Sequence, residues 1–241
     1  MSPEYLDALL YDWHNAHLLV RQNKDIDFFK AQLPPLGSLV FVFGAGTGRV
    51  STPLADSGRY VLAVDRSFER LLRIPVCEQT RYWICCADFQ KIGLLANVAD
   101  AALFPYSTFQ LLSTKAERRK VLCNVRKSLK IGASVWIDLS QHFETRQTTE
   151  WQHVLFASCK ELKLDIEEWI RVIPSNEFVT IITRYVSDKD IIHENKEVWY
   201  FESSINLGRL LESEGFRLKN IIHGYGDVET NHRHIYIAEK I

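Results

Sequence analysis

Short apolar runs alternate with helical patterns between residues 39 and 140. The runs LVFVFG, RYVLAVD, YWICCAD, AALFPYS and SVWIDLS have the length and the residue types of β-strands. The segments 49–58, 67–75 and 115–132 have helical patterns, and the first two end at Gly58 and Pro75. This alternation predicts βαβ units in a parallel, doubly wound sheet. Because the strands are almost continuously apolar, we expect both faces of the sheet to be covered.

The pattern changes after about Thr149. Residues 166–174, 178–187 and 193–203 alternate between apolar and polar positions and predict antiparallel strands. Residues 204–216 predict a helix that stops at Gly215, and residues 217–226 and 233–240 predict a final hairpin on the main sheet. The first 36 residues have a helical pattern. We therefore predict a helical cap at 1–36, a core at 37–149, an antiparallel β insertion at 150–203, and the last helix and strands of the core at 204–241.

The composition sets limits on this picture. The chain has 241 residues, of which 46% are hydrophobic and 24% are charged, which suits one large α/β core with an insertion. The net charge of −1 creates no general attraction to nucleic acid or to anionic membranes. No apolar run approaches the roughly 20 residues of a membrane helix. The first residues carry acids and no long apolar segment, so we expect no signal peptide and a cytoplasmic protein.

The five cysteines indicate reduced thiols and no cysteine-based zinc site. Their number is odd, and no pair has the spacing of zinc ligands. Cys85 and Cys86 lie in the apolar run WICCADF, which we interpret as a buried strand. We therefore expect buried, free thiols in a reducing compartment.

Three glycines follow the first predicted strand, in VFVFGAGTGRV. Ligands of open parallel sheets bind beyond the carboxyl ends of the strands. Gly44, Gly46 and Gly48 lack the Cβ atoms that would hold a ligand away from the backbone. A tight turn without a ligand is the alternative, and it explains one glycine better than three. A dinucleotide fingerprint needs a glycine where this chain has Arg49, so the spacing favours an adenosine ligand without a pyrophosphate.

Acidic residues end the next two predicted strands. Asp65, in LAVDRS, would lie beside the glycine turn, where its two oxygens could accept both ribose hydroxyls. The alternatives are a helix cap before SFERLL and a surface acid. Asp88, in CCADFQ, could accept an amino hydrogen of adenine, or it could simply belong to a turn.

Together these motifs resemble the class I S-adenosylmethionine-dependent methyltransferases. The resemblance rests on FGAGTGR, AVDRS, CCADF, ALFPYSTFQLL and SLKIGASVWIDLS, and it extends over nearly the whole chain. The leader YDWHNAHLLVRQNKDIDFF and the β insertion are similar to the small-molecule branch, which includes glycine and amino-sugar N-methyltransferases. The resemblance implies a seven-stranded Rossmann-like α/β core, an N-terminal helical lid, an insertion over the active site, and S-adenosylmethionine as cofactor.

The resemblance also implies which residues hold the cofactor. In the family, the glycine turn holds the methionine part and the ribose, the acid after the second strand holds the ribose diol, and the acid after the third strand touches adenine. A residue after the fourth strand lies where the methyl group meets the acceptor. The cofactor-binding residues expected by match are Tyr11, Gly44, Ala45, Gly46, Gly48, Arg49, Asp65, Arg66, Asp88, Phe89 and Phe104. For Arg49, which could contact the cofactor's carboxylate, a surface position on the first helical turn is the equal alternative.

Two positions depart from the family pattern. The family usually has an acid two places before the first glycine, and this chain has Val42. The amino-sugar enzymes have a histidine as candidate base after the fourth strand, and Gln110 occupies that position here. An amide cannot take a proton at neutral pH. We therefore consider Tyr106 and His142 as catalytic candidates, and we expect Tyr106, Gln110, His142, His223 and Tyr225 to line the acceptor site.

Each of these acceptor-site residues has a structural alternative. A lone histidine such as His142 is more often a surface residue, and HGYGD, which holds His223 and Tyr225, could be a plain glycine turn. His232 and His234 lie two apart in a predicted strand without an acid cluster, so we expect no metal. The basic segment 115–130 is explained by a solvated helix face.

We predict transfer of a methyl group from S-adenosylmethionine to a small molecule, most readily at nitrogen. The partner is then the small-molecule acceptor, with no nucleic acid and no membrane, and a homodimer is left open. The alternatives are a methyltransferase acting on oxygen or carbon, and a non-catalytic binding protein with the same fold. Val42 and the absent histidine favour the non-catalytic alternative, and the intact glycine turn with Asp65 disfavours it.

Overall fold

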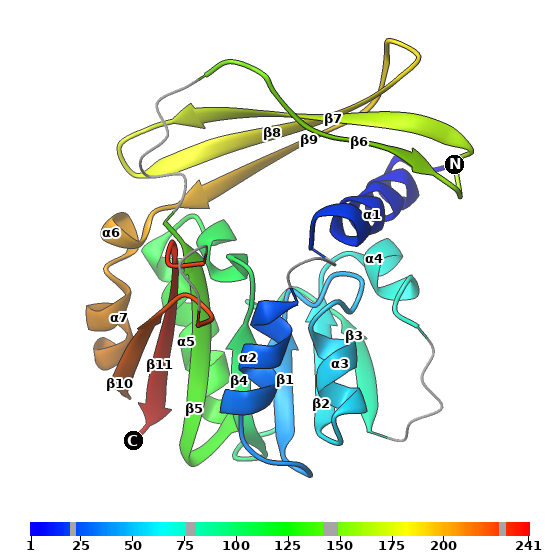
Figure 1. The fold of residues 1–241 in the computed structure, drawn as a ribbon. Coiled ribbons are helices and arrows are strands. Elements are labelled where there is room, and N and C mark those ends of the chain that lie inside the picture. The colour runs from blue at the N-terminus through cyan, green and yellow to red at the C-terminus, as the bar shows by residue number, and fades with distance from the viewer. Residues whose placement is uncertain (20–22, 76–80, 142–148, 227–229) are drawn as a thin grey trace.

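A seven-stranded sheet forms the centre of the computed structural model, which describes residues 1–19, 23–75, 81–141, 149–226 and 230–241. The strand order is β10-β11-β5-β4-β1-β2-β3 (Figure 1). Strands β1 to β5 pair in parallel, and β11 is antiparallel to both β5 and β10. This arrangement confirms the predicted doubly wound α/β sheet with a hairpin at one edge. The strands are β1 (Leu39–Phe43), β2 (Tyr60–Asp65), β3 (Tyr82–Cys86), β4 (Ala99–Phe104), β5 (Leu129–Ser140), β10 (Phe216–His223) and β11 (Arg233–Lys240).

Helices cover both faces of this sheet and its carboxyl edge. The capping box of α5 shows how the sequence starts a helix, because Thr114 accepts the Glu117 N–H while the Glu117 carboxylate accepts the Thr114 N–H. None of the described helices is long and apolar enough to cross a membrane. The helices are α1 (Pro3–His14), the π-helix η1 (Asn15–Leu19), α2 (Lys24–Gln32), α3 (Ser51–Asp56), α4 (Phe68–Leu72), the 3₁₀ turn η3 (Thr108–Leu111), α5 (Lys115–Ser128), α6 (Glu202–Ile205) and α7 (Leu207–Ser213).

The alternation of side chains along β1 divides the core into two layers. Phe41 and Phe43 point to the face covered by α5 and α7. Val40 and Val42 point to the opposite face, where they pack with residues of α2 and α3. Both layers exclude water, since all four side chains are at most 4% exposed. Val42 is therefore a core residue of the α2–α3 face.

A second, four-stranded antiparallel sheet lies over the main sheet, with α1 beneath it (Figure 1). We call α1 and this inserted sheet the roof. Leu9, Leu10 and Trp13 of α1 pack against Ile166 and Tyr185 of the inserted sheet. An apolar contact thus makes one body of two segments that lie far apart in the sequence. The inserted strands are β6 (Gln152–Cys159), β7 (Leu164–Pro174), β8 (Phe178–Ser187) and β9 (Asp190–Tyr200), in that order.

The sequence pattern predicted three of these four strands and missed β6. Its pairing with β7 changes register between His153 and Leu155. A bulge of this kind breaks the period of two on which the prediction relied. The domain boundaries proposed from the sequence stay a prediction.

Two further expectations differ from the structure. The helix expected over 204–216 is divided into α6 and α7, because Asn206 adopts a left-handed conformation with φ of 49°. The thiols expected to be buried are not uniformly so: Cys86 and Cys123 are exposed, Cys85 is partly buried, and Cys159 is buried. Strand β3 is the last strand of the sheet that the described residues form, and Cys86 at its end is exposed. Cys77 lies outside the described residues.

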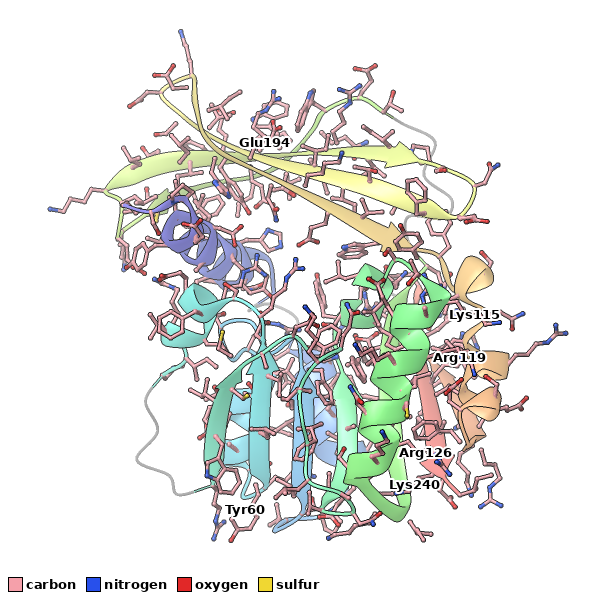
Figure 2. The ribbon with its side chains drawn as sticks, turned by 180° about the vertical axis from the view of Figure 1, so that it is seen from behind. Tyr60, Lys115, Arg119, Arg126, Glu194 and Lys240 are labelled. Atoms are coloured by element: carbon pink, nitrogen blue, oxygen red, sulfur yellow. The ribbon has the colours of Figure 1, made fainter. Side chains whose placement is uncertain are left out.

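The orientation of the strands places the site. Tyr60, the first residue of β2, lies at the end of the main sheet far from the inserted sheet, as does Lys240 (Figure 2). The carboxyl ends of the parallel strands therefore face the roof. At this edge the Tyr11 ring of α1 lies 3.2 Å from the position that a Cβ atom on Gly46 would take. A ligand at the carboxyl edge would be covered by α1 and the inserted sheet.

Candidate active site

The glycine turn joins β1 to α3. Gly44, Gly46 and Gly48 all have positive φ, at 68°, 56° and 89°, which residues with a side chain rarely adopt. The N–H groups of Gly44 and Ala45 both donate to the Val64 carbonyl of β2, at 2.8 and 3.0 Å. This backbone geometry accounts for the glycines before any ligand is considered. It also presents the remaining backbone of the turn at the carboxyl edge.

Asp65 connects the glycine turn to the end of β2. Its carboxylate is buried, and it accepts the N–H groups of Gly46 at 2.8 Å and of Ser67 at 2.9 Å, one on each oxygen. Ser67, and not Asp65, is the N-cap of α4. Each oxygen of Asp65 keeps a second lone pair. A vicinal diol could therefore bind without displacing the turn, which is the fit that an adenosine ligand needs.

Asp88 follows β3, the strand that pairs with β2. The Ala87 N–H donates to the Asp65 carbonyl, and Asp88 accepts the Gln90 N–H at 2.9 Å. The two acids thus follow neighbouring strands at one edge. This is where the sequence expected the ribose and adenine contacts.

The other expected cofactor residues differ in what they can offer. The Phe104 ring is fully buried and stacks on Phe43 at 4.8 Å, so only its main chain reaches the edge. Phe89 packs edge-on against both rings, at 6.2 and 6.0 Å. Ala45 is buried in the α2–α3 layer, and Arg66 is exposed. Among these four residues, the side chain of Phe89 and the main chain of Ala45 are the best placed for the cofactor contacts that the sequence analysis proposed.

Tyr11 and Arg49 already have partners within the chain. The guanidinium of Arg49 forms a two-pronged ion pair with Asp25 of α2, in which Nη1 lies 3.1 Å from Oδ1. Burial acts to lower the pKa of Arg49, but Asp25 outweighs it and the pKa is raised. The Tyr11 ring lies against Gly46 on one side, and Arg70 lies 4.2 Å from its centroid. Both residues tie the N-terminal helices to the glycine turn.

A hollow of about 400 Å³ separates the end of α1 from the outer side of the glycine turn. Both polar and apolar groups face it, and the carboxamide of Asn15 contributes a buried Nδ2 without a hydrogen-bond partner among the described residues. Its lining includes Asp12, Asn15, Thr47, Gly48, Arg49 and Pro75. The hollow shows that space remains between the roof and the turn.

A buried ion pair, which the sequence analysis missed, lies near the carboxyl end of β5. Asp138, at the end of β5, is fully buried and accepts from Arg233 Nε at 2.9 Å. Its other oxygen accepts the Tyr225 hydroxyl at 2.6 Å and the Tyr106 N–H at 2.9 Å. We call these four residues the floor cluster. An acid near the carboxyl end of an apolar strand, as Asp65 and Asp88 are near theirs, was the available signal for Asp138.

The two tyrosines of the floor cluster stay protonated. Burial raises the pKa of Tyr225 well above its ordinary value, and the nearby Asp138 adds to the rise, while Arg233 opposes it. The surrounding protein raises the pKa of Tyr106 as well, against the opposing charges of Arg233 and Arg49. The guanidinium carbons lie 5.1 and 5.3 Å from the Tyr106 ring. Tyr106 thus presents a neutral phenol, 38% exposed, at the cleft.

Gln110 links the core to the roof through side-chain hydrogen bonds. Its side chain is 1% exposed, its Oε1 accepts the Ser140 N–H at 2.7 Å, and its Nε2 donates to the carbonyls of Ser140 and Tyr200. Both amide hydrogens are therefore used at the points where β5 and β9 end. The structure places Gln110 inside the fold, away from the cleft surface on which a substrate contact was expected.

We expect the variant Gln110→Leu to lose about 1–3 kcal/mol of unfolding free energy, because it strands a buried N–H of the main chain. Chemical denaturation followed by circular dichroism measures this change. The neighbouring Leu111 is 42% exposed, and Leu111→Ala is the matched control, with an expected change within about 0.5 kcal/mol. Equal unfolding free energies of the two variants would show that the Gln110 hydrogen bonds do not contribute to stability.

The histidines expected at the acceptor site are not brought together. His223 is exposed on β10 and packs edge-on against His234, with ring centroids 4.4 Å apart. His142 lies outside the described residues. No group of three or more His, Cys, Asp or Glu residues suited to a metal ion occurs within the described part of the chain.

The roof contributes a second buried acid that the sequence did not reveal. Glu168 of β7 is 2% exposed, and both of its carboxylate oxygens lie 2.8 Å from Nδ1 of His14. The two residues are separated by 154 positions in the chain. No local pattern could have shown this pairing.

Comparisons with known proteins bear on the family and the fold of this chain. Residues 41–137 match the family model described as a methyltransferase domain. No curated protein sequence matches the chain. The CcbJ methyltransferase from Streptomyces caelestis has a similar structure, with a TM-score of 0.74, 16% identity, and coverage of 90% of this chain and 88% of that chain.

Two further solved structures are similar. The S-adenosylmethionine-bound amino pentose methyltransferase from Micromonospora echinaspora has a TM-score of 0.70 and 13% identity, over 90% of this chain and 88% of that chain. The sugar N-methyltransferase from Streptoalloteichus has a TM-score of 0.73 and 12% identity, over 96% and 91% of the two chains. At these identities the likeness shows the fold. The family match shows a methyltransferase domain over residues 41–137 of this chain.

Proposed function

We propose that the chain transfers a methyl group from S-adenosylmethionine to the nitrogen of a small amine. The observation that carries the proposal is the covered carboxyl edge, where the glycine turn and Asp65 lie below α1 and the inserted sheet. A covered site of this kind suits a small acceptor better than a polymer. The choice of nitrogen rests on the similar amino pentose and sugar N-methyltransferases.

The cofactor residues have separate tasks in this proposal. The backbone of Gly46 and Gly48 approaches the amino-acid part of the cofactor, Asp65 accepts the ribose hydroxyls, and Asp88 and Phe89 border the adenine. S-adenosylmethionine supplies a methyl group on a positively charged sulfur, which keeps the bonding electrons when the methyl group leaves. The side chain of Val42 is aliphatic and carries no charge, and it is fully buried in the core. Recognition of the amino-acid part therefore falls to the backbone of the turn and to Tyr11 of α1, which lies against Gly46.

The floor cluster positions the acceptor. Tyr106 offers a neutral hydroxyl that can donate to or accept from a small polar molecule. Its backbone and the Tyr225 hydroxyl are fixed by Asp138. A fixed floor and a covering roof keep the acceptor and the methyl donor in one orientation, which can supply a large part of the rate acceleration.

We expect Asp65→Ala to weaken the binding of S-adenosylmethionine and S-adenosylhomocysteine more than tenfold, or about 1.4 kcal/mol. Isothermal titration calorimetry measures both affinities. The matched control is Asp100→Ala, because Asp100 also accepts a strand N–H, that of Leu39 at 2.8 Å, but lies at the amino end of β4. Unchanged binding by Asp65→Ala would contradict the cofactor site.

The acceptor class needs its own test. The wild-type protein is incubated with S-adenosylmethionine and a panel of primary amines, amino sugars, phenols and simple alcohols, and the products are identified by mass spectrometry. We expect methylated products from the amine members of the panel. If the protein binds the cofactor but methylates only oxygen, the acceptor atom is oxygen and not nitrogen. If it binds neither S-adenosylmethionine nor S-adenosylhomocysteine, the non-catalytic alternative is favoured.

A further inference from the structure

One face of α1 turns toward the cleft. Asp7, Tyr11 and His14 are spaced i, i+4 and i+7, which places them on the same side of a helix. Leu9, Leu10 and Trp13 point elsewhere, into the apolar contact with the inserted sheet. Because the Tyr11 ring touches the glycine turn at Gly46, His14 lies one helical turn farther along the same cleft-facing side.

Glu168 fixes the chemistry of this histidine. A buried carboxylate is costly unless it is paired, and His14 is its hydrogen-bond partner among the described residues. Since the carboxylate can only accept, the neutral imidazole must carry its hydrogen on Nδ1. Its Nε2 then keeps a lone pair and can accept a proton. A histidine oriented in this way by a carboxylate has the geometry of a general base.

We propose that His14, oriented by Glu168, is the general base that deprotonates the acceptor nitrogen. This inference rests on the proposed methylation of an amine. An amine is mostly protonated at neutral pH and has no lone pair until it loses a proton. In the proposed step the N–H bond of the ammonium breaks, its electron pair stays on the nitrogen, and the proton moves to His14 Nε2. The proton then passes to water, which restores the base.

Other candidates on the cleft are less suited to this step. Tyr106 and Tyr225 have raised pKa values, so each keeps its own proton, and the Tyr225 hydroxyl is already donated to Asp138. His223 is exposed on β10. Gln110 is buried, and its amide cannot take a proton. Among these described residues, His14 is therefore the one suited to accept the proton.

The surroundings of His14 favour a cationic acceptor. The charged and titratable groups close to this face of α1 are Asp7 and Tyr11 on α1 itself, Arg49 beside the glycine turn, Arg70 on α4, Glu168 on β7, Tyr185 on β8, and His193 and Glu197 on β9. The three carboxylates outnumber the two guanidinium groups, and these are already paired, Arg70 with Asp7 at 2.9 Å and Arg49 with Asp25. The local charge is thus negative, which attracts an ammonium group.

The first experiment measures the methylation rate of the best amine in the panel between pH 6 and 9. We expect His14→Gln, which can still donate to Glu168 but cannot accept a proton, to lower kcat by about 10²–10⁴-fold. The rate of the variant should also lose the rise with pH that follows deprotonation of a base, while its affinity for S-adenosylhomocysteine stays unchanged. His17→Gln, one turn away and bonded to the Trp13 carbonyl, is the matched control and should keep the wild-type profile.

The second experiment needs no acceptor. NMR spectra of protein labelled with ¹⁵N-histidine, assigned with His14→Gln, should show the neutral His14 ring with its hydrogen on Nδ1. In Glu168→Gln, whose amide can also donate, we expect a shift toward the other tautomer. A ring that carries its hydrogen on Nε2 in the wild type would overturn the proposal.

The outcomes separate the two proposals. Normal kcat and an unchanged pH profile in His14→Gln, with an active wild type, would overturn the base and leave amine methylation standing. If His14→Gln changes the melting temperature but not the pH profile, the His14–Glu168 pair has a structural role and the proposed base is wrong. A wild type that methylates no amine would overturn the proposed function and the base with it.

Discussion

Replacing Asp138 by alanine should destabilise the protein by about 3–5 kcal/mol, because it leaves a buried guanidinium without its counter-ion. Arg233 is 4% exposed, and its Nη2 lies 2.7 Å from Asp138 Oδ1. Burial acts to lower the pKa of Arg233, and Asp138 outweighs this effect and raises it. The same change frees the Tyr225 hydroxyl and the Tyr106 N–H, so we expect weaker acceptor binding as well. Denaturant unfolding measures the stability term.

A double-mutant cycle separates the ion pair from the packing. The variant Asp138→Leu/Arg233→Met removes both charges and keeps apolar volume, and it should be more stable than Asp138→Leu alone. If Asp138→Ala cost less than about 1 kcal/mol, water would have to reach Arg233, and the floor cluster could not be a buried pair.

Replacing Gly44 by alanine is expected to damage both stability and cofactor binding. The φ of 68° costs an L-residue roughly 1–2 kcal/mol. The added Cβ would also lie 2.4 Å from Cγ2 and Oγ1 of Thr108, and such overpacking costs about 1–3 kcal/mol more. Relief of the contact would shift the turn away from Asp65. We expect a loss of roughly 2–5 kcal/mol in denaturant unfolding and a lower affinity for S-adenosylhomocysteine in calorimetry.

The chain offers a control that separates strain from contact. Gly37 also has a positive φ, of 84°, but no atom lies within 4 Å of the place its Cβ would take. Gly37→Ala should therefore lose only the strain term and keep cofactor binding. The double variant Gly44→Ala/Thr108→Ala removes the closest atoms and should recover part of the loss. No recovery would mean that the backbone conformation alone accounts for the effect.

The parts of this protein that were predicted from the sequence are those with local signals. Apolar runs and helical periods predicted the main strands along the chain, and Gly44, Gly46 and Gly48 predicted the turn between β1 and α3, with Asp65 at the end of the next strand. The bulge in β6 and the left-handed Asn206 break a period at single positions. Such local exceptions are invisible to a method that averages over a window.

The unpredicted part of the site consists of pairs between distant segments. Arg233 was considered only as the residue between two histidines, yet it reaches across 95 positions to Asp138. Glu168 stands in an alternating strand and shows no sign of its partner on α1. Local sequence can show that an acid ends a strand, but only the fold shows which base it meets.

The way in which the roof is attached has a kinetic consequence. The contact of α1 with the inserted sheet combines an apolar cluster with the His14–Glu168 and Asp7–His193 pairs. Its contact with α4 is ionic, because Arg70 pairs with Asp7 and Arg73 pairs with Asp12, and Arg73 also pairs with Glu161 between β6 and β7. At the opposite end Gln110 ties the last residue of β9 to the core. The roof is therefore attached to the core by hydrogen bonds at the Gln110 end and by ion pairs at the α4 end. Salt screens partly exposed charges far more than it weakens an apolar core. Rising ionic strength should therefore weaken the ion pairs and shorten the residence time of a bound ligand, while the roof itself stays folded.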